Sequence, residues 1–135
     1  MLILIFDDNL LSSASLLSQL QSSGHEALAV STAVEARRTV PRRPDALLIN
    51  LMARAFDPPA LIRQLLMDPA MQGAQIVGFC GHLDELRKTG ARDAGCHHVI
   101  SNAQAHKQLI TTLEQLLVAR DSSHGIRDQG SGIGN

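Results

Sequence analysis

The sequence predicts a doubly wound, parallel α/β fold. Five short apolar runs recur along the 135 residues, and each is followed by a segment with apolar residues at helical spacing. The runs are almost continuously apolar, which is typical of strands covered on both faces. Residues 121–135 contain four glycines and almost no apolar side chains. We therefore expect one domain over residues 1–120 and a disordered tail over residues 121–135.

The five predicted strands are the apolar runs themselves. Their bounds are residues 2–6, 26–30, 46–49, 75–79 and 97–100. Runs of this length, rich in Leu, Ile and Val, favour strands over buried helices. Five strands that alternate with helices should pair in parallel, with each connection passing over a face of the sheet.

The helices between the strands are predicted from their start and stop residues. Asn9 should cap the first helix, and Ser31 or Thr32 the second, because these side chains accept hydrogen bonds from the first helical N–H groups. Pro58–Pro59 opens the third helix, where a missing N–H breaks no helical bond. Gly95 should end the fourth helix. The last helix is expected to run from residue 102 to about residue 120.

Charge and composition argue against several classes of partner. The formal net charge is −1 and aromatic residues make up 2% of the chain, so neither nucleic acid nor a membrane surface is expected to bind. The N-terminal apolar run is too short for a signal peptide or a membrane span, so the expected location is the cytoplasm. Cys80 and Cys96 should be reduced there, and too far apart for a disulfide.

Polar side chains follow four of the predicted strands, at the point where each strand ends. They are Asp7, Asp8, Asn50, Cys80, Ser101 and Asn102. Because the carboxyl ends of parallel strands meet at one edge of a sheet, we expect these positions to share a crevice. No glycine-rich phosphate-binding motif occurs in the chain, so this edge is the candidate functional site.

Four stretches of the sequence, in order and at matching spacings, resemble the receiver domain of bacterial two-component response regulators. They read LILIFDDN, PDALLINLM, FDPPALIRQL and ARDAGCHHVISNA. The resemblance covers about residues 1–120. It implies a CheY-like, flavodoxin-type (βα)5 three-layer sandwich with a five-stranded parallel sheet.

The resemblance also implies a role for the residues at the strand ends. In that family an aspartate at the position of Asn50 is phosphorylated. A magnesium ion is held there by an acidic pair, by that aspartate and by a backbone carbonyl, which correspond here to Asp7, Asp8, Asn50 and Met52. An amide is a poor nucleophile towards a phosphoryl donor. Because it is neutral, asparagine at this position also provides no anionic ligand for the metal. We expect magnesium binding to be weak or absent, with Arg54 or water neutralising the acidic pair instead.

Three switch positions of the family also differ in this chain. Cys80 stands where the family has Thr or Ser, Val99 where it has an aromatic residue, and Asn102 where it has Lys. Asn102 cannot balance a phosphoryl charge, and the β-branched Val99 has no ring that could change rotamer. The phosphorylation switch is therefore expected to be dismantled at four positions.

The sequence thus predicts a non-catalytic, phosphorylation-independent pseudo-receiver that acts through protein–protein contact in bacterial signal transduction. Its partner would be a kinase or another signalling protein, docked on residues 84–120, and a homodimer is a further possibility. The alternative for residues 84–120 is an ordinary solvated charged surface. Two other functions stay open: a small-ligand site in the former phosphorylation crevice, and a receiver that retains magnesium. A phosphatase using Asp7 or Asp8 is disfavoured, because such enzymes typically carry D-x-D after the first strand.

Overall fold

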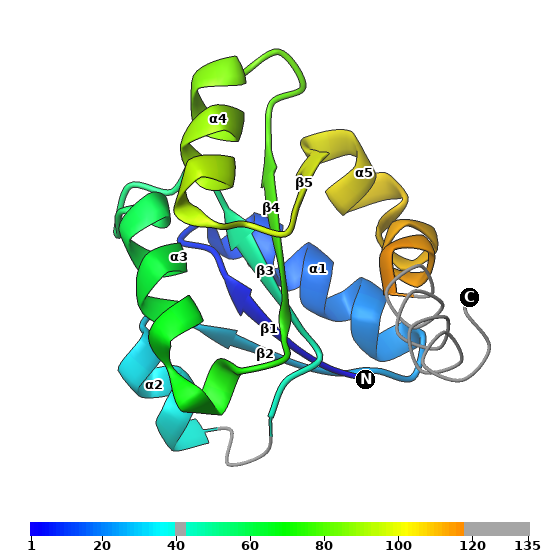
Figure 1. Ribbon diagram of the computed structural model, residues 1–135. Helices are drawn as coiled ribbons and strands as arrows, with labels where there is room; N and C mark the ends of the chain where they lie inside the picture. Colours follow the sequence, from blue (N-terminus) through cyan, green and yellow to red (C-terminus); the bar gives the residue numbers. More distant parts are fainter. Residues whose placement is uncertain (40–42, 118–135) are drawn as a thin grey trace, which may run out of the picture.

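The computed structural model describes residues 1–39 and 43–117 and shows one parallel sheet of five strands (Figure 1). The strands are β1 (Leu2–Phe6), β2 (Glu26–Val30), β3 (Ala46–Asn50), β4 (Gln75–Cys80) and β5 (His98–Ser101). Their spatial order is β2-β1-β3-β4-β5, the order of flavodoxin-like sheets. The predicted fold class is confirmed, and every predicted strand lies within one residue of the observed bounds.

Helices cover both faces of the sheet. They are α1 (Leu10–Ser22), α2 (Ala33–Thr39), α3 (Pro58–Met67), α4 (Glu85–Ala94) and α5 (Asn102–Lys107), with a 3₁₀ turn η1 (Pro69–Met71) after α3. Figure 1 shows α1 and α5 on one face, and α2, α3 and α4 on the other. Among the described residues, no helix combines the length and the apolar character needed to cross a bilayer.

The predicted start and stop residues are the ones that the helices use. The side-chain oxygen of Asn9 accepts a hydrogen bond from the Ser12 N–H at 3.1 Å, and that of Thr32 accepts one from the Glu35 N–H at 3.0 Å. Gly95 ends α4 with φ of 106°, a left-handed conformation that favours glycine. Asn9 and Thr32 thus cap the N-termini of α1 and α2 at the edge of the sheet where β1 and β2 end.

The last predicted helix is interrupted, which corrects the expectation of one helix over residues 102–120. Gln108 leaves the helical region, with φ of −135° and ψ of 30°, and a second helical segment then covers residues 109–117 (Figure 1, orange). On both sides of the interruption side chains stay buried in the same part of the core: Ala105 before it, and Leu109, Leu113 and Leu117 after it. The boundary at residue 120 and the predicted tail lie outside the described residues.

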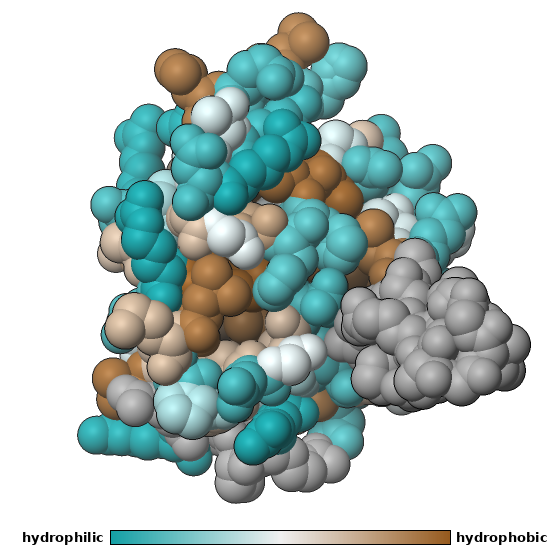
Figure 2. Space-filling view, in the orientation of Figure 1, coloured by the Kyte–Doolittle hydropathy of each residue, from teal (hydrophilic) through white to brown (hydrophobic). Residues whose placement is uncertain are grey.

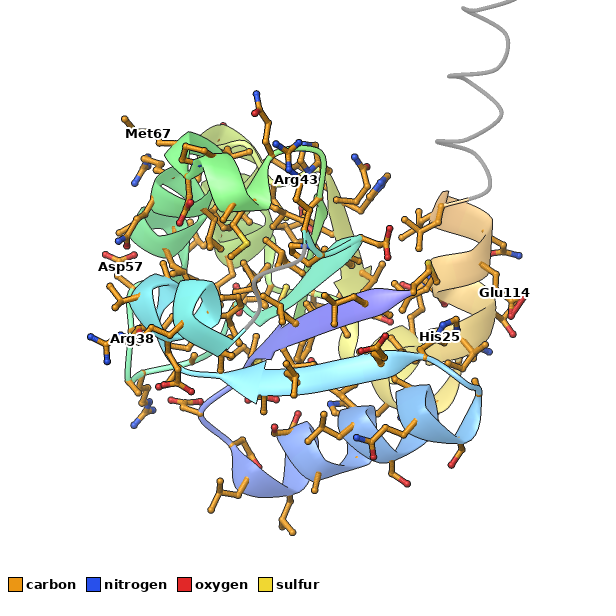
Figure 3. All side chains as sticks on the ribbon, turned by 90° about the horizontal axis from the view of Figure 1, so that it is seen from below. His25, Arg38, Arg43, Asp57, Met67 and Glu114 are labelled. Carbon is orange, nitrogen blue, oxygen red and sulfur yellow. The ribbon has the colours of Figure 1, made fainter. Side chains whose placement is uncertain are left out.

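The sheet divides the hydrophobic core into two clusters. Successive side chains of a strand point to opposite faces, so Ile76 and Cys80 of β4 pack beneath α3 and α4, whereas Val77 and Phe79 pack beneath α1 and α5. Figure 3 looks at the sheet from below and shows side chains filling both spaces, with Met67 pointing away from the core. The alternation in β4 decides which of its residues reach the candidate site.

Candidate functional site

A cleft of about 450 Å³ opens where β1, β3 and β4 end. It lies between the first turn of α1, the loop after β3 and the short helix α5. Its volume falls in the usual range for small-molecule sites. The residues that line it are Asp8, Asn9, Ser12, Asn50, Met52, Arg54, Phe79, Asn102 and His106.

Asn50 ties the acidic pair to the loop after β3. Its Nδ2 donates a hydrogen bond to Asp7 Oδ1 at 2.9 Å, and its Oδ1 accepts one from the Met52 N–H at 2.9 Å. A carboxylate only accepts hydrogen bonds and a backbone N–H only donates them, so the amide has one possible orientation. The Asn9 N–H also donates to Asp7 Oδ1, at 3.0 Å.

Asp8 holds the same loop through two backbone amides. Its Oδ2 accepts hydrogen bonds from the N–H groups of Arg54, at 2.7 Å, and of Ala55, at 3.0 Å. These two bonds are the main reason that the pKa of Asp8 lies below its usual range. The charge of the Arg54 guanidinium lowers this pKa too, but less. Arg54 thus acts on the acidic pair chiefly through its main chain.

The lowered pKa of Asp8 predicts a loss of stability in acid. The ionised carboxylate stabilises the fold fully above the unfolded pKa, near 3.8, and this contribution disappears as the pH falls through the lower folded pKa. We expect only about 0.5 kcal/mol, because water screens an exposed carboxylate. The free energy of unfolding, measured in urea as the pH is lowered from 6, should fall less in Asp8→Asn than in the wild type. Parallel curves for the two proteins would contradict the assignment.

Cys80 does not line the cleft, which corrects the expectation that it shares the crevice. It is fully buried, at 0% exposure, in the core cluster beneath α3 and α4. Strand alternation turns Phe79, its neighbour, towards the cleft instead. Burial raises the pKa of the Cys80 thiol, so it is poorly suited to nucleophilic chemistry. Val99 packs against the same cluster. Both cysteines are described, and both are free thiols.

Asn102 is the first residue of α5, which begins directly after β5. Ser101 caps this helix through a capping box: its hydroxyl accepts from the Gln104 N–H at 3.1 Å, and its own N–H donates to Gln104 Oε1 at 2.9 Å. Asn102 Nδ2 lies 3.8 Å from Met52 Sδ, a weak contact across the mouth of the cleft. Asn102 therefore brings a neutral amide to the cleft, facing the loop after β3.

The structure adds Ser12, His106 and Phe79 to the candidate site. Ser12 Oγ lies 3.1 Å from His106 Nε2, which joins α1 to α5 across the cleft. The His106 ring stands edge-on to the ring of Phe79, with centroids 5.8 Å apart and an interplanar angle of 88°. Residues four apart share a helix face, so the spacing of Asn102 and His106 is the signal that sequence reasoning missed.

The oxygen atoms of the acidic pair fit a magnesium ion poorly as they are arranged. Asp7 Oδ1 already accepts two hydrogen bonds, and so does Asp8 Oδ2. Asp7 Oδ2 is buried and has no hydrogen-bond partner among residues 1–39 and 43–117, which would favour a cation, but Asp7 is not among the cleft-lining residues. Within the same residues, no three His, Cys, Asp or Glu side chains form a group that could hold a metal ion.

The predicted partner face, residues 84–120, is described as far as residue 117. It carries internally paired charges and one exposed leucine, Leu86, with a second, Leu83, just before it. Arg87 pairs with Asp84 at 2.7 Å, and Lys88 with Glu85 at 3.2 Å. Leu83 and Leu86 are 84% and 88% exposed. In Figure 2, hydrophobic side chains protrude from a mostly hydrophilic surface where α4 begins.

Comparisons with known proteins identify the fold. No family model and no curated protein sequence matches the chain. Among solved structures, a putative response regulator from Chloroflexus aurantiacus matches 87% of this chain and 97% of its own, with 20% identity and a TM-score of 0.74. The chemotaxis response regulator CheY4 of Vibrio cholerae matches 84% of this chain and 96% of its own, with 16% identity and a TM-score of 0.71.

A third similar structure is a receiver domain that contains a magnesium ion. The receiver domain of a sensor histidine kinase from Pseudomonas aeruginosa, which has a magnesium ion coordinated in its active-site cleft, matches 84% of this chain and 94% of its own. Its identity is 19% and its TM-score is 0.71. These likenesses confirm the CheY-like receiver fold that the sequence predicted.

Proposed function

We propose that this chain is a receiver-like module that works without phosphorylation, through contact with other proteins of a bacterial signalling pathway. The observation that carries the proposal is the amide of Asn50, placed where β3 delivers a side chain to the cleft and bonded at both ends. Its Nδ2 donates to Asp7 and its Oδ1 accepts from the Met52 N–H. An amide engaged in this way offers no nucleophile to a phosphoryl donor.

The other switch positions support the same proposal. Cys80 has no hydroxyl and lies in the core, and Val99 packs against the same core cluster. Asn102 brings no charge to the cleft, and Lys88 is held elsewhere, by Glu85 and the carbonyl of His82. A phosphoryl group at this edge would find no lysine in the cleft lining. In this proposal the module catalyses no reaction, and its output is the binding of another protein.

The partner in this proposal is a kinase or another signalling protein that docks on residues 84–120, or a second copy of the chain. The exposed Leu86 in the first turn of α4, with the exposed Leu83 just before the face, supports the α4 part of this face. Reversing charges on this face should weaken capture of the partner from the native host without lowering the melting temperature of the chain.

The central prediction is that phosphodonors leave the protein unmodified. Incubation with acetyl phosphate and magnesium, followed by intact-mass analysis, should give no increase in mass, because residue 50 lacks a carboxylate. Asn50→Asp is the matched variant, since it restores the missing carboxylate without altering the other positions. Acid-labile phosphate on the wild type that is absent from Asn50→Ala would overturn the proposal.

A second candidate function is a small-ligand site in the same cleft. The observation that favours it is the polar lining of an open volume of about 450 Å³, to which Ser12, Asn102 and His106 contribute. Native mass spectrometry of freshly purified protein tests it. A copurifying ligand that is lost in Ser12→Ala and His106→Ala would favour the ligand site over the protein-binding module.

A further inference from the structure

We propose that the Asn50 amide takes the place of a divalent cation as the link between the acidic pair and the loop after β3. The cleft then keeps its shape without any metal ion. This inference rests on the proposed function and deepens it, because it says what holds the module in one conformation. It concerns stability rather than phosphorylation, so the two can be tested separately.

The first part of the link is a chain of hydrogen bonds through residue 50. It runs from the Met52 N–H to Asn50 Oδ1, and from Asn50 Nδ2 to Asp7 Oδ1, with both distances at 2.9 Å. A bridging cation would attract oxygen atoms on both sides. The amide achieves the same connection with one acceptor and one donor, and it carries no charge that needs compensation.

The second part of the link is the carboxylate of Asp8. It binds the N–H groups of Arg54 and Ala55 directly, so the loop is attached to the end of β1 at a second point. Hydrogen bonds from backbone N–H groups stabilise an ionised carboxylate, and Asp8 Oδ2 accepts two of them, at 2.7 and 3.0 Å. Together the two links hold residues 50–55 against residues 7 and 8 with groups of the chain alone.

A carboxylate at residue 50 would break this arrangement. It could still accept from the Met52 N–H, but it has no hydrogen to donate to Asp7. Two carboxylates would then face each other where Nδ2 and Oδ1 now lie 2.9 Å apart, and such a pair requires either a proton or a cation. The buried Asp7 Oδ2, which has no hydrogen-bond partner in the described part of the chain, would make the repulsion harder to relieve. The stability of the wild type should therefore be independent of divalent ions, whereas the stability of Asn50→Asp should depend on them.

Thermal unfolding with and without magnesium tests the inference on the full chain. We expect the melting temperature of the wild type to stay constant up to millimolar Mg²⁺. Asn50→Asp should melt about 5 °C lower in chelator and recover most of that loss when Mg²⁺ is added. Asn50→Ala is the matched control, because it removes the link without adding charge. It should melt lower in chelator and show no recovery.

Two results would overturn the inference. One is a magnesium-dependent rise in the melting temperature of the wild type, or saturable shifts of the Asp8 and Met52 amide resonances during a magnesium titration. The other is an Asn50→Asp variant as stable as the wild type in chelator. If Asn50→Asp does not fold, the magnesium titration of the wild type decides alone. Phosphate transfer to the wild type would contradict the proposed function, but the melting data would still decide whether Asn50 links the acidic pair to the loop.

Discussion

Replacing Phe79 with alanine should lower the free energy of unfolding by about 3–5 kcal/mol, because a large buried side chain is removed and the cavity cannot collapse completely. Phe79 is 1% exposed, belongs to the core beneath α1 and α5, and also lines the cleft. Its ring supports that of His106. A loss of this size is a large fraction of the stability of an ordinary domain, which is about 5–15 kcal/mol.

Urea denaturation followed by circular dichroism measures this loss. Phe56→Ala is the matched control, because Phe56 is half-buried and packs only at the margin of the other core cluster. We expect the control to lose well under half as much free energy as Phe79→Ala. Equal losses in the two variants would mean that Phe79 does not pack as the structure shows.

Replacing Gly78 with alanine should lower the free energy of unfolding by about 1–3 kcal/mol, the usual cost of overpacking a core. A Cβ atom at this position would lie 2.8–2.9 Å from three side-chain carbons of Leu51. Leu51 is itself buried in the cluster beneath α3 and α4, and its N–H donates to the Phe79 carbonyl. The side chain can therefore move aside only by disturbing the loop that carries the candidate site.

Gly90→Ala provides the matched control for Gly78→Ala. It makes the same chemical change, but the nearest atom to the new Cβ is Pro59 Cγ at 3.8 Å, an ordinary contact. Gly90 lies inside α4, where alanine is the better helix former by about 1 kcal/mol. Thermal unfolding should therefore give opposite signs for the two variants. A Gly78→Ala protein as stable as the wild type would show that Leu51 is not confined.

The fold could be predicted because its signals are local. Each strand is a continuous apolar run, and caps such as Asn9 and Thr32 act within three residues of their partners. The interruption at Gln108 has no such signal, since no proline or glycine occurs there. On its two sides, His106 of α5 meets Ser12 of α1, and Leu109, Leu113 and Leu117 pack in the core. Contacts between distant helices leave no mark in a short window of sequence.

The site could be predicted only in part, for a related reason. The positions of Asp8, Asn50 and Asn102 follow from where strands end, and all three line the cleft. Successive side chains of β4 face opposite sides of the sheet. Because residues 76–80 are all apolar or glycine, the sequence does not indicate which side Cys80 faces. Arg54 was expected to act through its guanidinium, but its backbone N–H makes the closer contact with Asp8. Main-chain groups are present in every residue, so residue type cannot single them out.

The capping box at the start of α5 bears on how phosphorylation control could be restored to a module of the proposed kind. Asn102 lies in a helical turn that Ser101 and Gln104 already close, so a lysine there would have to reach the cleft from a helix rather than from a free loop. A hydroxyl at residue 80 would enter a closed apolar core, where a polar group without a partner is unfavourable. If the Asn50 link acts as we propose, a carboxylate gained at residue 50 alone would lower the stability of the chain and would give no signal in return. In the proposed function, phosphorylation control would therefore require several substitutions made together.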